Sequence, residues 1–199
     1  LLIKMSKTFN LNDASYDAQE SKAIFNNGIA GVVENCSARV ERTKQEDKSN
    51  PNAPDYKIFF ADPSGAEVNV AFWYPKDDET EENIIKFLKK LKHIAHCFSG
   101  ADAQLPAGNP QTIMDGVMNM LRESGMSASV RVMTNYGTQG RESQYLRVRT
   151  FVPFVESMSV DKASSKLRSS NIENFERPAA TETSGAVTAS AGSDSDDWD

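Results

Sequence analysis

The sequence has no apolar run of about 18 residues, the length that a membrane-spanning helix requires. Its opening stretch, LLIKMSK, is too short to be the apolar core of a secretory signal peptide. Met5 opens MSKTFN like a natural start, so we leave residues 1–4 out of the fold argument. These absences favour a cytoplasmic protein without membrane partners.

Cysteine is scarce, since only Cys36 and Cys97 occur among 199 residues. Two cysteines cannot make a disulfide scaffold, and we expect both to be small buried side chains in a reducing compartment. His93 and His96 lie close to Cys97, but their spacing matches no common zinc pattern. We therefore predict no metal site.

Familiar catalytic motifs are missing as well. The chain contains no G-x-x-x-x-G-K-[ST] phosphate loop, no G-x-S-x-G elbow and no H-E-x-x-H zinc helix. The acidic run DDETEE, Asp77 to Glu82, is typical of a solvated helix N-terminus, where carboxylates suit the helix dipole. We expect a protein that is not an enzyme and that needs no cofactor.

The chain also lacks an excess of positive charge, with a formal net charge of −6. The charge is unevenly distributed, because residues 179–199 carry −5 and contain no Lys or Arg, which leaves −1 for the rest. A nearly neutral body can still present a basic face if its cations are segregated.

Composition divides the chain into three parts. Residues 1–26 are expected to form an N-terminal arm packed on the domain, with a short helix near Ser15 to Phe25. Residues 27–160 carry the patterned sequence of a folded domain. Residues 161–199 are expected to be a flexible linker and an acidic tail, because the stretch after about Arg177 holds too little apolar surface to fold.

Alternating apolar and polar residues predict five strands, and helical spacing predicts two helices between the third and fourth. The first strand is long and contains Gly31, so we expect it to be bent or bulged and to serve two parts of a sheet. A tight turn is expected at Asp62 to Gly65, between the second and third strands. The predicted strands are Ile29–Lys44, Asp55–Ala61, Ala66–Pro75, Ser127–Asn135 and Ser143–Val155, and the predicted helices are Asp77–Phe98 and Gln111–Ser124.

This order is not that of a doubly wound α/β sheet, in which strands and helices alternate. Five short strands with a helical insert after the third predict a mainly β fold, the five-stranded OB-fold barrel. In such barrels the loops that join strands one to two and four to five flank the ligand groove; here these are about residues 44–54 and 135–142.

One face of the predicted sheet combines cations with aromatic rings. On the fifth strand Leu146 and Val148 alternate with Tyr145 and Arg147, and the same alternation places Met133 on the outer side of the fourth strand. Cations that follow phosphates and rings that stack on unpaired bases are what single-stranded nucleic acid requires. The candidate DNA-binding residues are Arg39, Lys57, Phe59, Trp73, Arg131, Tyr136, Arg141, Tyr145, Arg147 and Arg149. Alternatively, the aromatic rings pack under the helices or the N-terminal arm.

Strand order, helical insert, basic and aromatic face and acidic tail together resemble a phage-encoded single-stranded DNA-binding protein. The tail residues that carry this resemblance are Asp194, Asp196, Asp197, Trp198 and Asp199. The resemblance implies sequence-independent binding and protection of single-stranded DNA during phage replication, recombination and repair, in the cytoplasm of the host cell. It also implies that the tail recruits replication or recombination proteins and competes with DNA for the groove.

Two other functions are compatible with the same pattern. A phage structural protein or protein-interaction module could use a small β-barrel to bind another protein, with the acidic tail as a solubiliser or docking peptide. Oligosaccharide binding on the same fold would be insensitive to salt, whereas DNA binding would fall steeply with salt.

Overall fold

The computed structural model describes residues 23–43, 50, 52–138, 140–149 and 153–179. The predicted tail residues and all but the last residues of the predicted N-terminal arm lie outside these ranges. The strands are β1 (Gly31–Arg42), β2 (Tyr56–Ala61), β3 (Glu67–Phe72), β4 (Val130–Thr138), β5 (Arg141–Val148) and β6 (Val155–Ser157), and the helices are α1 (Glu81–Ser99) and α2 (Pro110–Ser124). Short 3-10 turns are η2 (Phe25–Gly28) and η4 (Ser169–Asn171).

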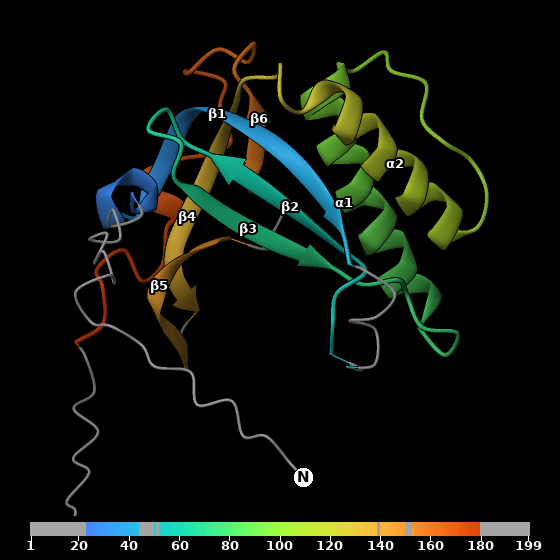
Figure 1. Cartoon of the computed structure of the whole chain (residues 1–199), viewed down its shortest axis with the longest axis horizontal. Coiled ribbons are helices and arrows are strands. Elements are labelled where there is room, and N and C mark those ends of the chain that lie inside the picture. The colour runs from blue at the N-terminus through green and yellow to red at the C-terminus, as the bar shows by residue number, and fades with distance from the viewer. Residues whose placement is uncertain (1–22, 44–49, 51, 139, 150–152, 180–199) are drawn as a thin grey trace, which may run out of the picture.

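The strands form one antiparallel sheet in the order β3-β2-β1-β4-β5, and β6 pairs with β4 (Figure 1). The predicted mainly β fold with a helical insert is thus confirmed. β3 and β5 lie at the two ends of this order. Their Cα atoms approach within 8 Å, but no ladder of hydrogen bonds joins them in the described part of the chain.

β1 is the strand that links the two halves of the sheet. Its first half pairs with β4 and its second half, from Ser37, pairs with β2. The register shifts between Val33 and Cys36, where Asn35 adopts a left-handed φ of 59°. An inserted residue of this kind bends a strand and increases its twist. The prediction of a bulged first strand that serves two parts of the sheet is confirmed.

The β2–β3 hairpin turns at Asp62, as the sequence predicts. The backbone N–H of Gly65 donates to the carbonyl of Asp62 over 2.9 Å, and Gly65 has a φ of +83° that suits glycine. The Asp62 carboxylate accepts hydrogen bonds from the backbone N–H groups of Asn26, Ser64 and Ala66 and from the Ser64 hydroxyl. It therefore ties the N-terminal segment to the hairpin.

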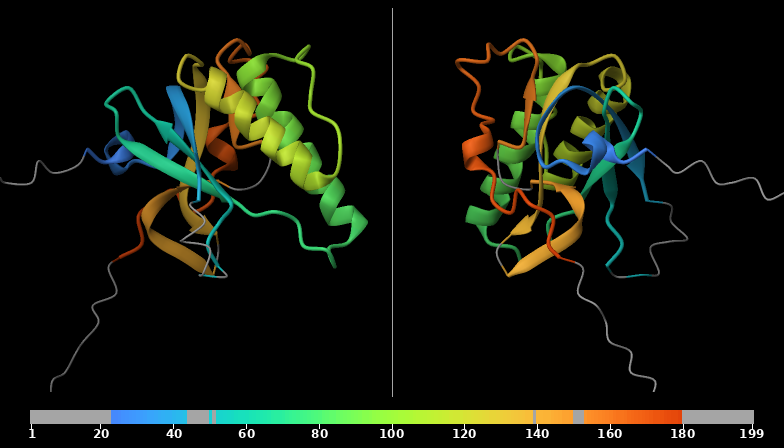
Figure 2. Two further views of the ribbon diagram at one scale, coloured as in Figure 1. Left: turned by 45° about the vertical axis from the view of Figure 1, so that its right-hand side comes forward. Right: turned by 90° about the vertical axis from the view of Figure 1, so that its left-hand side faces the viewer.

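Both helices pack side by side on one face of the sheet (Figure 2). Thr80 caps α1 by accepting from the N–H of Asn83, and Asn109 caps α2 by accepting from the N–H of Thr112. The predicted start of the first helix at Asp77 is thus four residues too early. The apolar stripes of the helices meet the inner side chains of the sheet in one core, whose fully buried large residues include Tyr56, Ile58, Phe60, Leu91, Ile94, Met114, Met118 and Leu121.

The predicted fifth strand, Ser143 to Val155, is two strands instead of one. β5 and β6 lie along the same edge of β4, and Met133 bonds to both sides of the break. Its carbonyl accepts from the N–H of Arg149 over 2.9 Å, and its N–H donates to the carbonyl of Phe154 over 2.8 Å. Arg149 and Phe154, five residues apart in the sequence, therefore bond to the same residue of β4, which alternation alone does not reveal.

The chain after β6 packs on the sheet beyond residue 160, where the domain was predicted to end. Ser165 and Leu167 are buried, and Ser165 Oγ donates to the Glu156 carboxylate over 2.6 Å. The N–H of Tyr136 donates to the carbonyl of Asn174 over 3.1 Å. This segment, residues 158–175, covers the side of β4 that faces away from the helices, so residues 130–136 are buried on both faces.

Candidate nucleic-acid interface

A groove of about 500 Å³ runs between the two end strands of the sheet, β3 and β5. Its walls are the outer side of β3 from Glu67 to Ala71, then Trp73, and β5 from Tyr145 to Val148. Trp73 is 50% exposed and Tyr145 is 75% exposed, which is unusual for rings of this size. The groove thus brings together two exposed aromatic residues and the Arg147 guanidinium.

Strand geometry explains why these side chains face outward. Val68, Val70 and Phe72 point into the core, so the alternating positions on β3 and the residue that follows it face the groove. On β5 the ladder with β4 is irregular, because residues 143–146 lie opposite Tyr136 alone. Such bulges re-aim side chains, and Tyr145 within this one lines the groove with 75% of its surface exposed.

Hydrogen bonds position two of the three groove side chains. The Trp73 indole Nε1 donates to the carbonyl of Asn52 over 3.3 Å, which links the ring to the end of the β1–β2 loop. Arg147 Nε donates to the Ser143 hydroxyl over 3.0 Å. Sequence reasoning missed Ser143, although its spacing from Arg147 on a predicted strand places both on one side of the sheet.

The groove continues at both ends of β3. Trp73 also lines a hollow of about 410 Å³ with Lys76 and the first turns of α1. At the other end, Glu67 and Asn69 line a hollow of about 500 Å³ that reaches Phe59. Sequence reasoning selected neither Lys76 nor Asn69, even though the alternation that identified Trp73 places Asn69 on the same side of β3.

Arg39 of β1 is held by two carboxylates near the hollow that reaches Phe59. Its guanidinium lies 3.9 Å from the centre of the Phe59 ring, bonds to Glu67 over 2.6 Å, and also bonds to Glu41. The hydrogen bond from Arg39 lowers the pKa of Glu67, and the same bond raises the pKa of Arg39. The predicted cation of β1 is thus neutralised by two glutamates. Lys57, half-buried on β2, pairs in register with Glu41 and Ala71.

Two predicted interface residues are buried, which corrects their assignment. Arg131 is 4% exposed and bonds to Glu34 over 3.2 Å, to Glu156 over 3.3 Å and to the carbonyl of Val160 over 2.9 Å. Met133, predicted on the same side, is 1% exposed. The alternation of β4 was read correctly, but the segment of residues 158–175 covers the side that was expected to be exposed.

Tyr136 is the second buried residue, with 4% of its surface exposed and its hydroxyl donating to the carbonyl of Gly28. The prediction placed it in a long loop with Arg141. β4 instead continues to Thr138, which pairs with Arg141 at the start of β5. The turn is therefore a tight hairpin, and Arg141 is exposed at its end.

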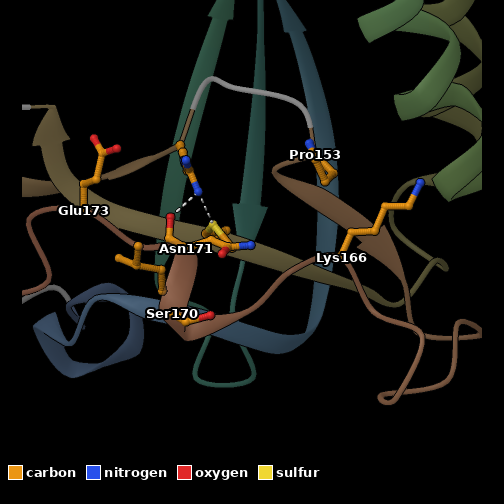
Figure 3. A pocket seen from close by; sticks show the side chains of 8 residues that line it. Pro153, Lys166, Ser170, Asn171 and Glu173 are labelled. Carbon is orange, nitrogen blue, oxygen red and sulfur yellow. Dashed lines mark hydrogen bonds between the residues drawn. The ribbon is translucent and has the colours of Figure 1, made fainter.

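Arg149 belongs to a second pocket, of about 320 Å³, between the end of β5 and the η4 turn (Figure 3). Its Nη1 donates to the carbonyl of Asn171 and lies 3.4 Å from Met133 Sδ. Of the ten predicted residues, the groove thus unites Trp73, Tyr145 and Arg147.

The histidine and cysteine cluster packs against β6. His93 Nε2 lies 2.7 Å from the carbonyl of Val155, and Cys97 Sγ lies 3.5 Å from the same atom. Cys36 is fully buried and Cys97 is half-buried, and burial raises the pKa of each thiol to about 12. Within the described ranges no three His, Cys, Asp or Glu residues come together as metal ligands.

Neither helix in the described part of the chain combines the length and apolar character needed to cross a bilayer. Comparisons of the chain with protein-family models, with curated proteins and with solved structures find no match.

Proposed function

We propose that this protein binds single-stranded DNA without sequence preference in the groove between β3 and β5. The observation that supports the proposal most strongly is the pair of exposed rings, Trp73 and Tyr145, beside Arg147 in one groove. Stacking of a base on an aromatic ring contributes about 1–3 kcal/mol and tolerates any base, since every base has a π-face. The guanidinium supplies a phosphate contact at the same place.

We infer that the sheet is that of an OB-fold. Support comes from the antiparallel order β3-β2-β1-β4-β5, from β1 shared between both halves, and from the helices inserted between β3 and β4. The close approach of β3 and β5 is the place where such a barrel would close. In this fold, oligonucleotides bind on the outer face of the barrel between its flanking loops.

Titration with homopolymer DNA tests the proposal. Oligo-dT should quench the fluorescence of Trp73, and duplex DNA of equal length should bind more weakly because its bases cannot stack on protein rings. Tyr145→Ala and Arg147→Ala should each weaken binding about tenfold, whereas Lys89→Ala on the solvent side of α1 should leave it unchanged. Equal affinity for single and double strands would contradict the stacking mechanism.

The acidic tail completes the proposal. Gln144 Nε2 on β5 donates to the carbonyl of Ala179 over 3.0 Å, so the described chain ends next to Gln144, the residue before Tyr145. Asp194, Asp196, Asp197, Trp198 and Asp199 follow within a tether that begins beside the groove. A tethered segment acts at an effective concentration of roughly millimolar, sufficient to compete with phosphates for cations. We propose that the tail competes with DNA and recruits replication or recombination proteins.

A protein-interaction module is the second candidate, because β3 and β5 are both end strands of the described sheet. End strands offer backbone N–H and C=O groups to an added strand of another protein. Salt separates the two functions. DNA binding releases counterions and weakens steeply with salt, whereas strand addition relies on backbone hydrogen bonds and apolar side chains.

A further inference from the structure

The pocket at the break in the fifth strand lies outside the β3–β5 groove. It lies between Arg149, the residue that follows β5, and Pro153, which precedes β6, opposite Met133 of β4. The η4 turn and Lys166 close its other sides. Its volume, about 320 Å³, falls at the lower end of the range for small-molecule sites. Interruptions of a strand often lie beside binding sites because they re-aim side chains.

Arg149 is held in this pocket through one nitrogen of its guanidinium. Nη1 makes both of its contacts, one to the carbonyl of Asn171 and one to Met133 Sδ. Within the described residues, Nε and Nη2 have no protein acceptor. A guanidinium held in one orientation loses little conformational freedom when it binds a phosphate, and it can do so through two parallel hydrogen bonds.

A second cation lines the pocket, since Lys166 Nζ forms no ion pair or hydrogen bond within the part of the chain that the structure describes. The root of its side chain is fixed, because the Lys166 N–H donates to Glu156 Oε1 over 3.0 Å. Ser170 and Asn171 add a hydroxyl and an amide to the lining. In Figure 3, Pro153 and Lys166 lie on one side of the pocket and Glu173 on the other.

The remaining walls are apolar. Pro153 and Ile172 offer a pyrrolidine ring and a branched side chain, whereas Met133 also lines the pocket but is only 1% exposed. Apolar surface next to two cations, an amide and a hydroxyl suits a ligand with a flat ring and a phosphate. The Glu173 carboxylate at the rim can accept a hydrogen bond from a base, and it repels a phosphate that lies too close.

The pocket also continues the cationic row of the groove. Arg149 follows Arg147 by two residues, and its N–H extends the pairing with β4 by donating to the carbonyl of Met133, so the two Cα atoms lie about 7 Å apart on the same side. Since Arg147 lines the groove and Arg149 lines the pocket, a strand that leaves the groove past Arg147 reaches the pocket next.

We propose that this pocket binds one nucleotide, with the phosphate on Arg149 and Lys166 and the base against Pro153 and Ile172. The ligand is either a unit of the strand held by the groove or a free nucleoside monophosphate. Binding of a unit of the strand rests on the proposed function, whereas binding of a free nucleoside monophosphate does not.

Thymidine monophosphate tests the pocket without reference to strand binding. Titration of the full chain, followed by backbone amide chemical shifts, should give a saturable change at Met133, Lys166 and Ile172. Lys166→Gln should weaken this binding about fivefold, the effect expected for one exposed charge contact. Glu173→Gln should strengthen it, a gain that a damaged fold would not produce. Lys89→Gln serves as the matched control and should change nothing.

Oligothymidylates of increasing length test the strand as the source. If the pocket is a further subsite, Lys166→Gln should leave the shortest oligomers unaffected and weaken the longer ones, with a salt slope reduced by about one. Tyr145→Ala should weaken all lengths. Mononucleotide binding that depends on Lys166, without binding of any oligomer, would support the pocket and contradict the proposed function.

Two results would overturn the pocket proposal while leaving the proposed function intact. One is oligomer binding that depends on Tyr145 but never on Lys166, together with no mononucleotide binding. The other is mononucleotide binding that Lys166→Gln does not change.

Discussion

At the scale of single residues, Arg131 joins three parts of the chain. Its guanidinium contacts Glu34 of β1, Glu156 of β6 and the carbonyl of Val160, and the side chain is 5% exposed. Lys162 adds a second cation next to Glu34, and the hydrogen bond from Lys162 lowers the pKa of that glutamate. Arg131 therefore has a structural role, and its substitution should lower the free energy of unfolding.

We expect Arg131→Ala to lower the free energy of unfolding by about 3 kcal/mol, because it leaves the buried Glu156 carboxylate without its cation. For a chain of this size the melting temperature should fall by about 6–12 °C. Arg122→Ala at the exposed end of α2 is the control and should have little effect. If the variant kept its melting temperature but lost oligo-dT affinity, Arg131 would instead be a DNA-binding residue.

Asp62 provides a pH-dependent test at the same scale. Burial alone would raise the pKa of this carboxyl, but hydrogen bonds from Ser64, Asn26 and Ala66 outweigh it and hold the pKa below its ordinary value. A lowered pKa in the folded state stabilises the protein above the ordinary aspartate pKa of about 4. That stability is lost as the pH falls through the lower folded-state value.

Asp62→Asn should therefore cost about 1–2 kcal/mol at pH 7, and the difference from the wild type should shrink on acidification below about pH 4. Urea unfolding at several pH values measures this difference. Asp102→Asn, at an exposed position after α1, should be neutral throughout. A cost for Asp62→Asn that does not change with pH would show that the geometry of the hairpin matters and the charge does not.

At the scale of elements, the β4–β5 hairpin positions Tyr145 and Arg147 and depends on two glycines. Gly137 has a φ of +93°, and a Cβ there would lie 2.3 Å from the carbonyl oxygen of Arg141. Gly140 has a φ of +76°, but a Cβ there would meet nothing within 4 Å. Any L-residue would be strained at both positions because φ is positive, but only at position 137 would its Cβ also clash with the backbone.

Gly140→Ala should thus cost about 1 kcal/mol, the penalty for a left-handed alanine. Gly137→Ala should cost at least about 2 kcal/mol more, since backbone would have to move, and it should also weaken oligo-dT binding by displacing Tyr145. Chemical denaturation and fluorescence titration of both variants test this prediction. Equal effects of the two substitutions would show that the hairpin relaxes around the added methyl group.

The strands show which parts of the fold could be predicted from the sequence. Local alternation predicted β2 and β3, placed Trp73 on the outer side, and identified the bulged first strand. It could not predict that residues 158–175 return to cover β4, because that contact joins segments far apart in the sequence. For the same reason Arg131 was assigned to an exposed surface, whereas Tyr136 was assigned to a loop although β4 continues through it to Thr138. The break after Arg149 was missed because apolar residues continue on both sides of it.

At the scale of the whole molecule, charge is separated between the body and the C-terminal residues. Residues 179–199 carry −5 of the net −6, and Ala179, the last described residue, lies beside Gln144 of β5. The cations next to the groove are few, because Arg39 is paired with two glutamates. A polyanion tethered here would therefore have only modest affinity for the groove.

Deleting residues 193–199 should therefore strengthen oligo-dT binding several-fold at low salt, because a competitor at roughly millimolar effective concentration is removed. The gain should fade as salt rises, since salt weakens the contacts of tail and DNA with the same cations. The full chain should consequently show the shallower salt dependence. Replacing Asp194, Asp196, Asp197 and Asp199 by Asn should reproduce the deletion if charge alone competes, and Trp198→Ala should do so if the ring occupies a stacking position. Affinity that is unchanged or weaker after the deletion would contradict tail competition at this groove.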